Sequence, residues 1–425
     1  MALYPMPRGE VTAQEKREIS LRRAAELKKR IEDYLRIKDQ ISTGFDLTAT
    51  MEAKKKEIMA CFGAGENDWQ DWRWQLKHRI SDPDLLGRLM HLEPEYIDGI
   101  KKVGRRFRWA ISPYYATLVT SDRPGGPVWR QAVPDIRELD ISGYEDPMAE
   151  EFTSPAPGIT RRYPDRLIIN VTNQCAMYCR HCQRRRNIGE VDRHKPVAVF
   201  KEALDYIRNN PEIRDVLITG GDALMLSDQM LDWLLGELDG IGHVEIKRIG
   251  TRVIVTMPQR ITPQLCAVLE KHPPVYINTQ FNHPREVTAE AAAACDRLIR
   301  AGVVLGNQAV LLKDVNNDPH VMKKLNQQLL RIRVRPYYIF HAKQVKGTGH
   351  FVTSVDEGIE IMDKLRGYTS GLAVPAYIIN APNGFGKTPV LPRYVIGRDD
   401  HHITLRTWEK RLIQYPSESS SKLVR

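Results

Sequence analysis

Residues 166–182 read RLIINVTNQCAMYCRHC, an apolar run that leads into three closely spaced cysteines. The first seven residues are rich in aliphatic and β-branched side chains, which favours a buried strand. Similar runs recur along the chain, separated by helical segments such as LDWLLGELDGI. Strands that alternate with helices over about 220 residues predict an α/β fold with a parallel sheet and right-handed crossovers. The predicted strands cover 166–172, 215–221, 244–250, 275–281, 303–311, 334–340 and 373–379.

Polar residues follow each predicted strand at its carboxyl end. Ligands of parallel sheets and barrels bind at this edge, so we expect the functional site there. The residues concerned are Asn173, Gly220–Asp222, Thr251–Arg252, Asn282–His283, Asn307–Gln308, His341–Lys343 and Asn380.

The cysteines indicate a metal cluster rather than disulfides. Cys175, Cys179 and Cys182 have the spacing Cys-x3-Cys-x2-Cys, whereas the other three cysteines are scattered, unlike a disulfide framework. Zinc ribbons use paired C-x2-C knuckles, and neither Cys266 nor Cys295 supplies a second pair. Three thiolates in one loop fit an iron–sulfur cube, which needs four ligands and so keeps one iron open to an external ligand. A zinc site or simply buried thiols are the alternatives.

The composition excludes several classes of protein. The chain has 425 residues, of which 42% are hydrophobic and 27% charged, which argues against intrinsic disorder. We see no apolar run that could span a membrane and no secretory leader, and we expect a soluble, cytoplasmic protein with no membrane partner. The net charge of +10 keeps nucleic-acid binding open. We favour anionic small ligands as its explanation and expect no nucleic-acid partner.

The chain is predicted to have three regions. Residues 1–155 form an N-terminal, mostly helical domain, residues 156–395 the α/β domain, and residues 396–425 a C-terminal extension and tail. A charged helix is expected over residues 10–45, with a narrow apolar stripe that indicates packing on another domain or on another subunit of a homo-oligomer. A second helix over residues 69–80 would place Trp69 and Trp72 on one core-facing side.

Two weaker motifs point to a second cofactor. Lys387 lies in the glycine-rich segment NAPNGFGKTPV (380–390), and a lysine beside small residues can reach an aldehyde and form a Schiff base. The segment RRYPDR (161–166) offers guanidinium groups and a tyrosine that could clamp a phosphate dianion.

The loop CAMYCRHC after the first strand resembles the radical S-adenosylmethionine superfamily, and Gly220–Asp222 matches its glycine-rich loop. Together with RYPDR, GTRV, FNHP, GNQAVLL, RVRPYY, RGYTSG and GKTPV, the chain resembles the lysine 2,3-aminomutase family. The resemblance implies a partial (βα) barrel of the radical S-adenosylmethionine type with about six βα units. It also implies a [4Fe-4S] cluster, S-adenosylmethionine and pyridoxal 5′-phosphate inside that barrel.

The resemblance assigns roles to individual residues. It implies an isomerase in which a 5′-deoxyadenosyl radical removes a hydrogen and the substrate amino group moves from C2 to C3. An external one-electron reductant of the flavodoxin or ferredoxin type would start the reaction. The implied residues are Cys175, Cys179 and Cys182 for the cluster; His181, Gly220, Gly221, Asp222 and Gln308 for S-adenosylmethionine; Lys387 for the Schiff base with pyridoxal phosphate; Arg162, Tyr163 and Arg166 for its phosphate; and Arg184 for the substrate α-carboxylate.

Two positions depart from the lysine-specific enzymes. Where the resemblance places aspartates that hold the substrate ammonium, this chain has Lys343 and Asn380. A lysine facing a lysine substrate would bring two like charges together in a low dielectric, whereas a cation and an amide donor suit a carboxylate. This favours the glutamate-specific branch of the family, with conversion of L-glutamate to β-glutamate. Asp318 stands where those enzymes have a zinc-binding cysteine, so no structural zinc is expected.

Three other functions stay open at this point. The chain could be an aminomutase for another amino acid, or a radical enzyme that modifies RNA or protein, which the net charge of +10 would suit. A non-catalytic helical scaffold with a redox cluster is the third.

Overall fold

The computed structural model describes residues 11–417 and divides the chain into two compact units, residues 1–41 and 42–425. In the first unit, α1 (Ala13–Lys29) begins at Thr12, whose side chain forms a capping box with Glu15, and α2 (Glu32–Ile37) follows it. The prediction of one helix over 10–45 is therefore wrong. Ile31, with φ −116° and ψ 9°, leaves the helical conformation between the two pieces, and neither glycine nor proline marks the break in the sequence.

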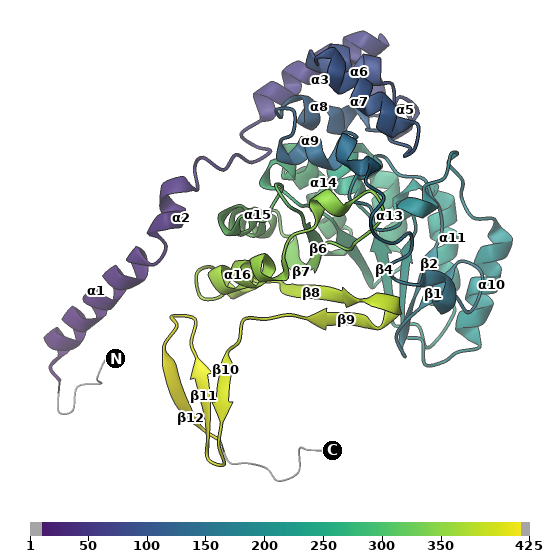
Figure 1. Cartoon of the computed structure of the whole chain (residues 1–425). Helices are drawn as coiled ribbons and strands as arrows, with labels where there is room; N and C mark the ends of the chain where they lie inside the picture. Colours follow the sequence, from purple (N-terminus) through teal and green to yellow (C-terminus); the bar gives the residue numbers. More distant parts are fainter. Residues whose placement is uncertain (1–10, 418–425) are drawn as a thin grey trace. The chain divides into compact units, whose positions relative to one another are not determined.

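The second unit is built around a nine-stranded sheet in which the strands lie side by side in chain order (Figure 1). Strands β2 to β8 are parallel, whereas β1 (Ile159–Arg161) and β9 (Gly386–Pro389) pair antiparallel at the two edges. All the predicted strands are confirmed to within a few residues. Their bounds are β2 (Arg166–Asn170), β3 (Asp215–Thr219), β4 (Ile246–Gly250), β5 (Val275–Thr279), β6 (Val304–Leu311), β7 (Arg335–His341) and β8 (Ala376–Ala381).

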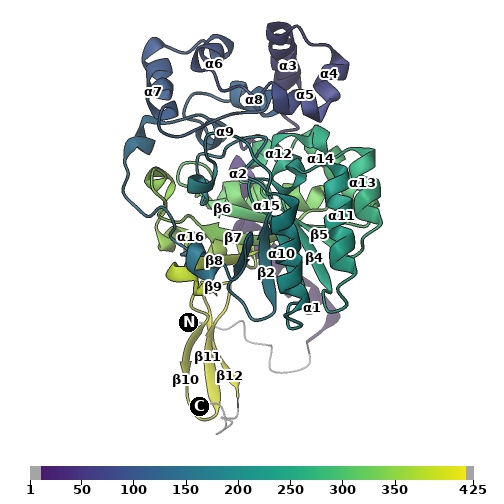
Figure 2. The ribbon, with the colours of Figure 1, turned by 90° about the vertical axis from the view of Figure 1, so that its right-hand side faces the viewer.

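A helix crosses over between each pair of successive parallel strands and lies on the outer face of the curled sheet (Figure 2). Each is amphipathic; α10, for example, buries Phe200, Leu204 and Ile207 against the strands. These crossovers make the curled half-barrel that the resemblance implied. The crossover helices are α10 (Val197–Arg208), α11 (Asp228–Asp239), α13 (Pro263–Glu270), α14 (Ala289–Arg300), α15 (Pro319–Arg331) and α16 (Val355–Leu365), with the short α12 (Val253–Thr256) before α13.

Residues 42–155 are mostly helical, as predicted, and belong to the same compact unit as the barrel. The expected helix over 69–80 is wrong in one respect: it divides at Asp71, whose carboxylate caps the second piece by accepting from Arg73 N at 2.9 Å. Trp69 is buried in the core, as predicted. The helices are α3 (Thr48–Phe62), α4 (Glu66–Gln70), α5 (Trp72–Lys77), α6 (Pro83–Met90), α7 (Pro94–Gly104), α8 (Pro113–Thr120) and α9 (Pro127–Ala132).

The C-terminal extension contains a small antiparallel sheet of β10 (Val395–Arg398), β11 (His402–Arg406) and β12 (Leu412–Pro416). The predicted tail beyond residue 417 lies outside the described residues. Within residues 11–417, no helix is long and apolar enough to cross a membrane.

Candidate functional site

A cavity of about 310 Å³ opens at the carboxyl ends of the parallel strands. This volume is at the lower end of the range of small-molecule sites. Tyr163 and Arg166 do not line it, but they lie beside Lys387, which does. The predicted residues that line it are Arg162, Cys175, Cys179, His181, Cys182, Arg184, Gly220, Gly221, Asp222, Gln308, Lys343, Asn380 and Lys387.

The loop with the three cysteines is held from outside the barrel. Its backbone donates from Tyr178 N to the Ala110 carbonyl at 3.1 Å and from Arg180 N to the Gln131 carbonyl at 2.9 Å. Both acceptors belong to the N-terminal helical region, so that region helps to fix the position of the cysteine loop relative to the ends of the strands. The three thiols are free, and burial raises the pKa of Cys175 and Cys182.

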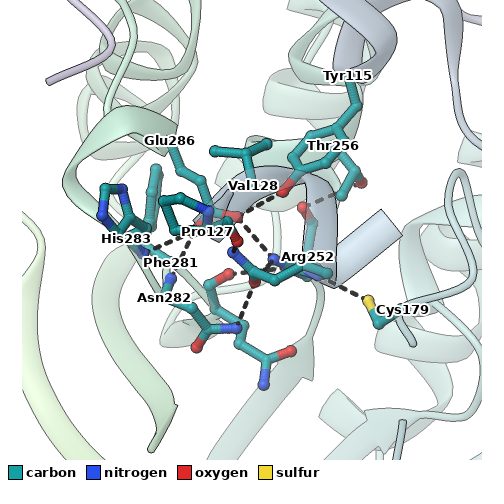
Figure 3. A network of polar contacts seen from close by, with 12 residues as sticks. Tyr115, Pro127, Val128, Cys179, Arg252, Thr256, Phe281, Asn282, His283 and Glu286 are labelled. Carbon is teal, nitrogen blue, oxygen red and sulfur yellow. Dashed lines mark hydrogen bonds and ion pairs between the residues drawn. The ribbon is translucent and has the colours of Figure 1, made fainter. Parts of the chain in front are cut away.

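A buried arginine approaches one of these thiols (Figure 3). Arg252 donates from Nη1 to Sγ of Cys179 at 2.8 Å and from Nη2 to Glu286 at 2.7 Å. Glu286 also accepts from the Tyr115 hydroxyl at 2.7 Å, and Gln131 accepts from Arg252 at 2.6 Å. Arg252 therefore places a guanidinium beside one of the three cysteine sulfurs.

The donor set fits an iron–sulfur cube. Among residues 11–417, no three His, Cys, Asp or Glu side chains converge closely enough to hold one metal ion. A cube does not require this, because each thiolate binds a different iron. The three cysteines line one cavity, and a cationic cluster bound there would stabilise their thiolate forms against the effect of burial.

Glycines allow the loop after β3 to pack against the cysteine loop. Gly220 has φ +144°, and a Cβ on Gly221 would lie 2.5 Å from the Gln174 carbonyl. Asp222 lies in the cavity wall, but its carboxylate accepts from Thr251 Oγ1 at 2.6 Å and from Arg252 N at 2.7 Å. Asp222 therefore joins the loops after β3 and β4, which is a positioning role.

His181 and Gln308 both line the cavity. His181 lies edge-on to the ring of Phe351, and its Nδ1 has no hydrogen-bond partner among the described residues. Burial lowers the pKa of His181 well below its ordinary value, so the ring is neutral. Gln308 lies at the register shift between β6 and β7 and lines the cavity.

Lys387 sits among aromatic rings. Its Nζ lies 5.6 Å from the ring centre of Tyr338 and 5.7 Å from that of Tyr163, while its backbone N–H donates to the Tyr163 hydroxyl at 2.8 Å. Burial, followed by the charges of Arg248 and Arg166, lowers the pKa of Lys387 to about 8. A neutral amine is therefore accessible near physiological pH, and this is the form that condenses with an aldehyde.

The part of the cavity beside Lys387 is also cationic. Lys343 donates to the Gln183 side chain, and its pKa is lowered to about 7 by burial and then by the charges of Arg184 and Arg162. Asn380 Nδ2 is buried with no hydrogen-bond partner among the described residues. An anion that entered here would find an unused amide donor beside a lysine and an arginine.

Comparisons with known proteins agree with this arrangement. Residues 169–322 match the radical SAM superfamily, and residues 362–422 match the lysine-2,3-aminomutase family. The chain is 54% identical over 405 residues to the glutamate 2,3-aminomutase of Clostridioides difficile strain 630, covering 95% of this chain and 96% of that protein. It is 48% identical over 350 residues to the L-lysine 2,3-aminomutase of Clostridium subterminale, covering 82% and 84%. The chain belongs to the lysine 2,3-aminomutase family. It is an amino acid 2,3-aminomutase, an isomerase, and its superfamily implies a [4Fe-4S] cluster and S-adenosylmethionine.

The structure of this aminomutase also reveals a site residue that the sequence did not single out. Glu150 is buried and forms ion pairs with Arg162 and Arg184, both at 2.9 Å, and with Arg186 at 3.2 Å. These charges hold the pKa of Glu150 at about 2, despite its burial. Glu150 thus joins an arginine assigned to the cofactor phosphate to the arginine assigned to the substrate. The acidic segment 145–151 was the only signal, and it lies far from its arginines in sequence.

Other strand-end residues serve the fold of the aminomutase. The Asn282 side chain accepts from Val310 N at 2.9 Å, and Asn307 exchanges hydrogen bonds with the Phe281 backbone. Asp318, at the position considered for zinc, caps α15 by accepting from His320 N at 2.7 Å.

Proposed function

We propose that this aminomutase converts L-glutamate to β-glutamate. The observation that carries the proposal is that Lys343 and Asn380 both line the cavity, with the charge of Arg184 close to Lys343. A side-chain carboxylate desolvated there gains charge-assisted hydrogen bonds, each of which contributes roughly 1.5–3 kcal/mol. The ammonium of a lysine substrate would instead meet like charges. The similarity to a protein named glutamate 2,3-aminomutase supports the same choice.

The two carboxylates of glutamate are expected to be bound by different residues. Arg184 binds the α-carboxylate through its Nη1 side, while Glu150 holds the Nε and Nη2 edge. Lys343 and Asn380 bind the side-chain carboxylate. Because the pKa of Lys343 is about 7 in the free protein, a bound anion raises it and glutamate binding takes up a proton near neutral pH.

Cofactor binding follows the same geometry. Cys175, Cys179 and Cys182 hold the cluster, Lys387 attaches pyridoxal phosphate, and Arg162, whose buried Nε has no hydrogen-bond partner among the described residues, binds the phosphate with Tyr163 and Arg166. When bound, the cluster and S-adenosylmethionine supply the radical that takes hydrogen, and pyridoxal phosphate supplies the carbonyl carbon that carries the migrating amino group. The protein contributes placement of these groups and exclusion of water from them.

The aminomutase is also proposed to be a homo-oligomer that takes its electron from an external one-electron carrier. Leu21 and Leu27 on α1 are large apolar side chains that are exposed in the single chain, which supports a contact with another copy. Light scattering of the purified protein tests the oligomer directly.

The substrate is tested by product analysis. Reduced protein reconstituted with iron, sulfide, S-adenosylmethionine and pyridoxal phosphate is incubated separately with glutamate, lysine and aspartate. The proposal predicts β-glutamate (3-aminoglutarate) as the product from glutamate, and little product from lysine or aspartate. β-Lysine as the main product would contradict it.

A further inference from the structure

A second hollow lies on the outer surface, behind the cysteine loop. Its lining includes Trp72, Arg73 and Lys77 from α5, together with Arg79 and Gln174. Arg73 and Lys77 are exposed, and Trp72 is half-buried with the Arg260 guanidinium 4.6 Å from its ring centre. Nothing in the mechanism above uses these residues.

The cysteine loop lies between this hollow and the cavity. Gln174 lines the outer hollow and its neighbour Cys175 lines the inner cavity. Arg79 bridges the two sides, because it reaches the hollow and donates from Nη1 to the Cys175 carbonyl at 2.6 Å. At this place the wall between the surface and a cluster ligand is a single stretch of main chain.

The hollow is basic. Asp192, which lies beside it, is already paired with Arg79 at 2.5 Å and with Arg108 at 2.9 Å, so it does not offset Arg73 and Lys77. Asp228 is likewise paired with the buried Arg260 at 2.7 Å. The segment that follows Asp192 adds two exposed basic side chains, Arg193 and Lys195.

We propose that this hollow docks an acidic one-electron carrier protein that reduces the cluster. The inference rests on the proposed function, because a cluster that starts a radical reaction must receive an electron from outside. In the step, one electron leaves the reduced carrier and enters the cluster, and no bond or proton changes place. A small basic surface with one aromatic side chain fits the weak, charge-steered contacts typical of electron-transfer pairs. It fits a nucleic acid less well, because its aromatic side chain is covered on one face by Arg260 rather than open for stacking.

The test compares two sources of electrons. The variant Arg73→Glu with Lys77→Glu reverses the charge of the hollow but leaves Arg79 and its contact with Cys175 in place. Cluster reduction is followed by absorbance and electron paramagnetic resonance in stopped-flow and freeze-quench experiments. The donors are reduced flavodoxin and, separately, photoreduced deazariboflavin, a small neutral molecule. Lys271→Glu is the matched control, since Lys271 is an exposed lysine that precedes β5, at the amino-terminal end of the strands.

We expect the double variant to be reduced by flavodoxin at least ~10-fold more slowly than the wild type at low salt, because charge steering raises association rates by about 10- to 1,000-fold. Reduction by deazariboflavin and the behaviour of Lys271→Glu should be unchanged, and added salt should slow the wild type but not the variant. An unchanged rate with flavodoxin, an equal loss with both donors, or a loss of RNA binding in place of the flavodoxin effect would overturn the proposal. A cluster that is reduced normally in a protein that makes no β-amino acid would refute the proposed function and leave the docking surface standing.

Discussion

Asn380 lies directly opposite Lys387 in the antiparallel pair of β8 and β9. Residues opposite each other in such a pair project to the same face of the sheet, and both side chains line the cavity. The residue proposed to recognise the substrate carboxylate and the residue proposed to attach the cofactor are therefore placed by one hairpin. We expect a change at Asn380 to impair substrate binding without affecting attachment of pyridoxal phosphate, and a change at Lys387 to abolish that attachment.

Replacement of Asn380 by alanine removes an amide donor that the described residues leave unused. The glutamate KM should rise at least ~10-fold, because a hydrogen bond to a charged group contributes roughly 1.5–3 kcal/mol. Attachment of pyridoxal phosphate should be unchanged. Thr388→Ala, at an exposed neighbour of Lys387 in β9, is the control and should behave as the wild type. An unaltered KM in Asn380→Ala would remove this residue from substrate recognition.

Replacement of Lys387 by alanine should abolish covalent attachment of pyridoxal phosphate while the iron content stays normal. The reason is geometric, because Lys387 combines a cavity position with a pKa of about 8. Borohydride reduction followed by peptide mapping should label Lys387 in the wild type and in Lys346→Ala, whose lysine is paired with Glu145. A label on another lysine contradicts the assignment.

Each of Cys175→Ala, Cys179→Ala and Cys182→Ala should lose the four-iron cluster and with it all cleavage of S-adenosylmethionine. A cube held by three protein thiolates has no spare ligand in this loop. Iron and sulfide analysis and the visible spectrum check this, with Cys61→Ala as the control because Cys61 is exposed and does not line the cavity. A full cluster in any of the three variants would show that the ligand set is different.

Glu150→Gln should destabilise the protein and loosen both arginines that Glu150 joins. Removing one partner of a buried ion pair costs about 3 kcal/mol, which urea unfolding would measure. Because the pKa of Glu150 is lowered to about 2, its contribution is complete above its ordinary pKa near 4.5 and is lost as the pH falls toward 2. The variant should therefore lose less stability than the wild type between pH 5 and pH 2. Parallel pH profiles for the two proteins would contradict this role.

Much of the fold could be predicted, and so could the convergence of most candidate site residues on one cavity, for identifiable reasons. The strands are short apolar runs bounded by polar segments. The cysteines and Lys387 each lie in a short contiguous motif, so their chemistry can be inferred without knowledge of the tertiary contacts. Contacts between distant segments could not be predicted: Glu150 reaches Arg184 only through the tertiary fold, and Arg252 reaches Cys179 across two strand-end loops. Not every polar residue at a strand end lines the cavity, since Asn282 and Asn307 instead hold the backbone of neighbouring segments. The helix break at Asp71 depends on a side-chain cap, which hydrophobic periodicity does not show, and the break at Ile31 has no side-chain cap that could have predicted it.

The central claim is that Lys343 selects a substrate with a side-chain carboxylate, and the most direct measurement is kcat/KM for glutamate in the wild type and in Lys343→Asp. The variant places a like charge where the carboxylate binds, so kcat/KM should fall at least ~100-fold while the cluster and pyridoxal phosphate contents stay normal. A value within a few-fold of the wild type would mean that Lys343 does not hold the substrate carboxylate, and the proposal of glutamate would lose its main structural support.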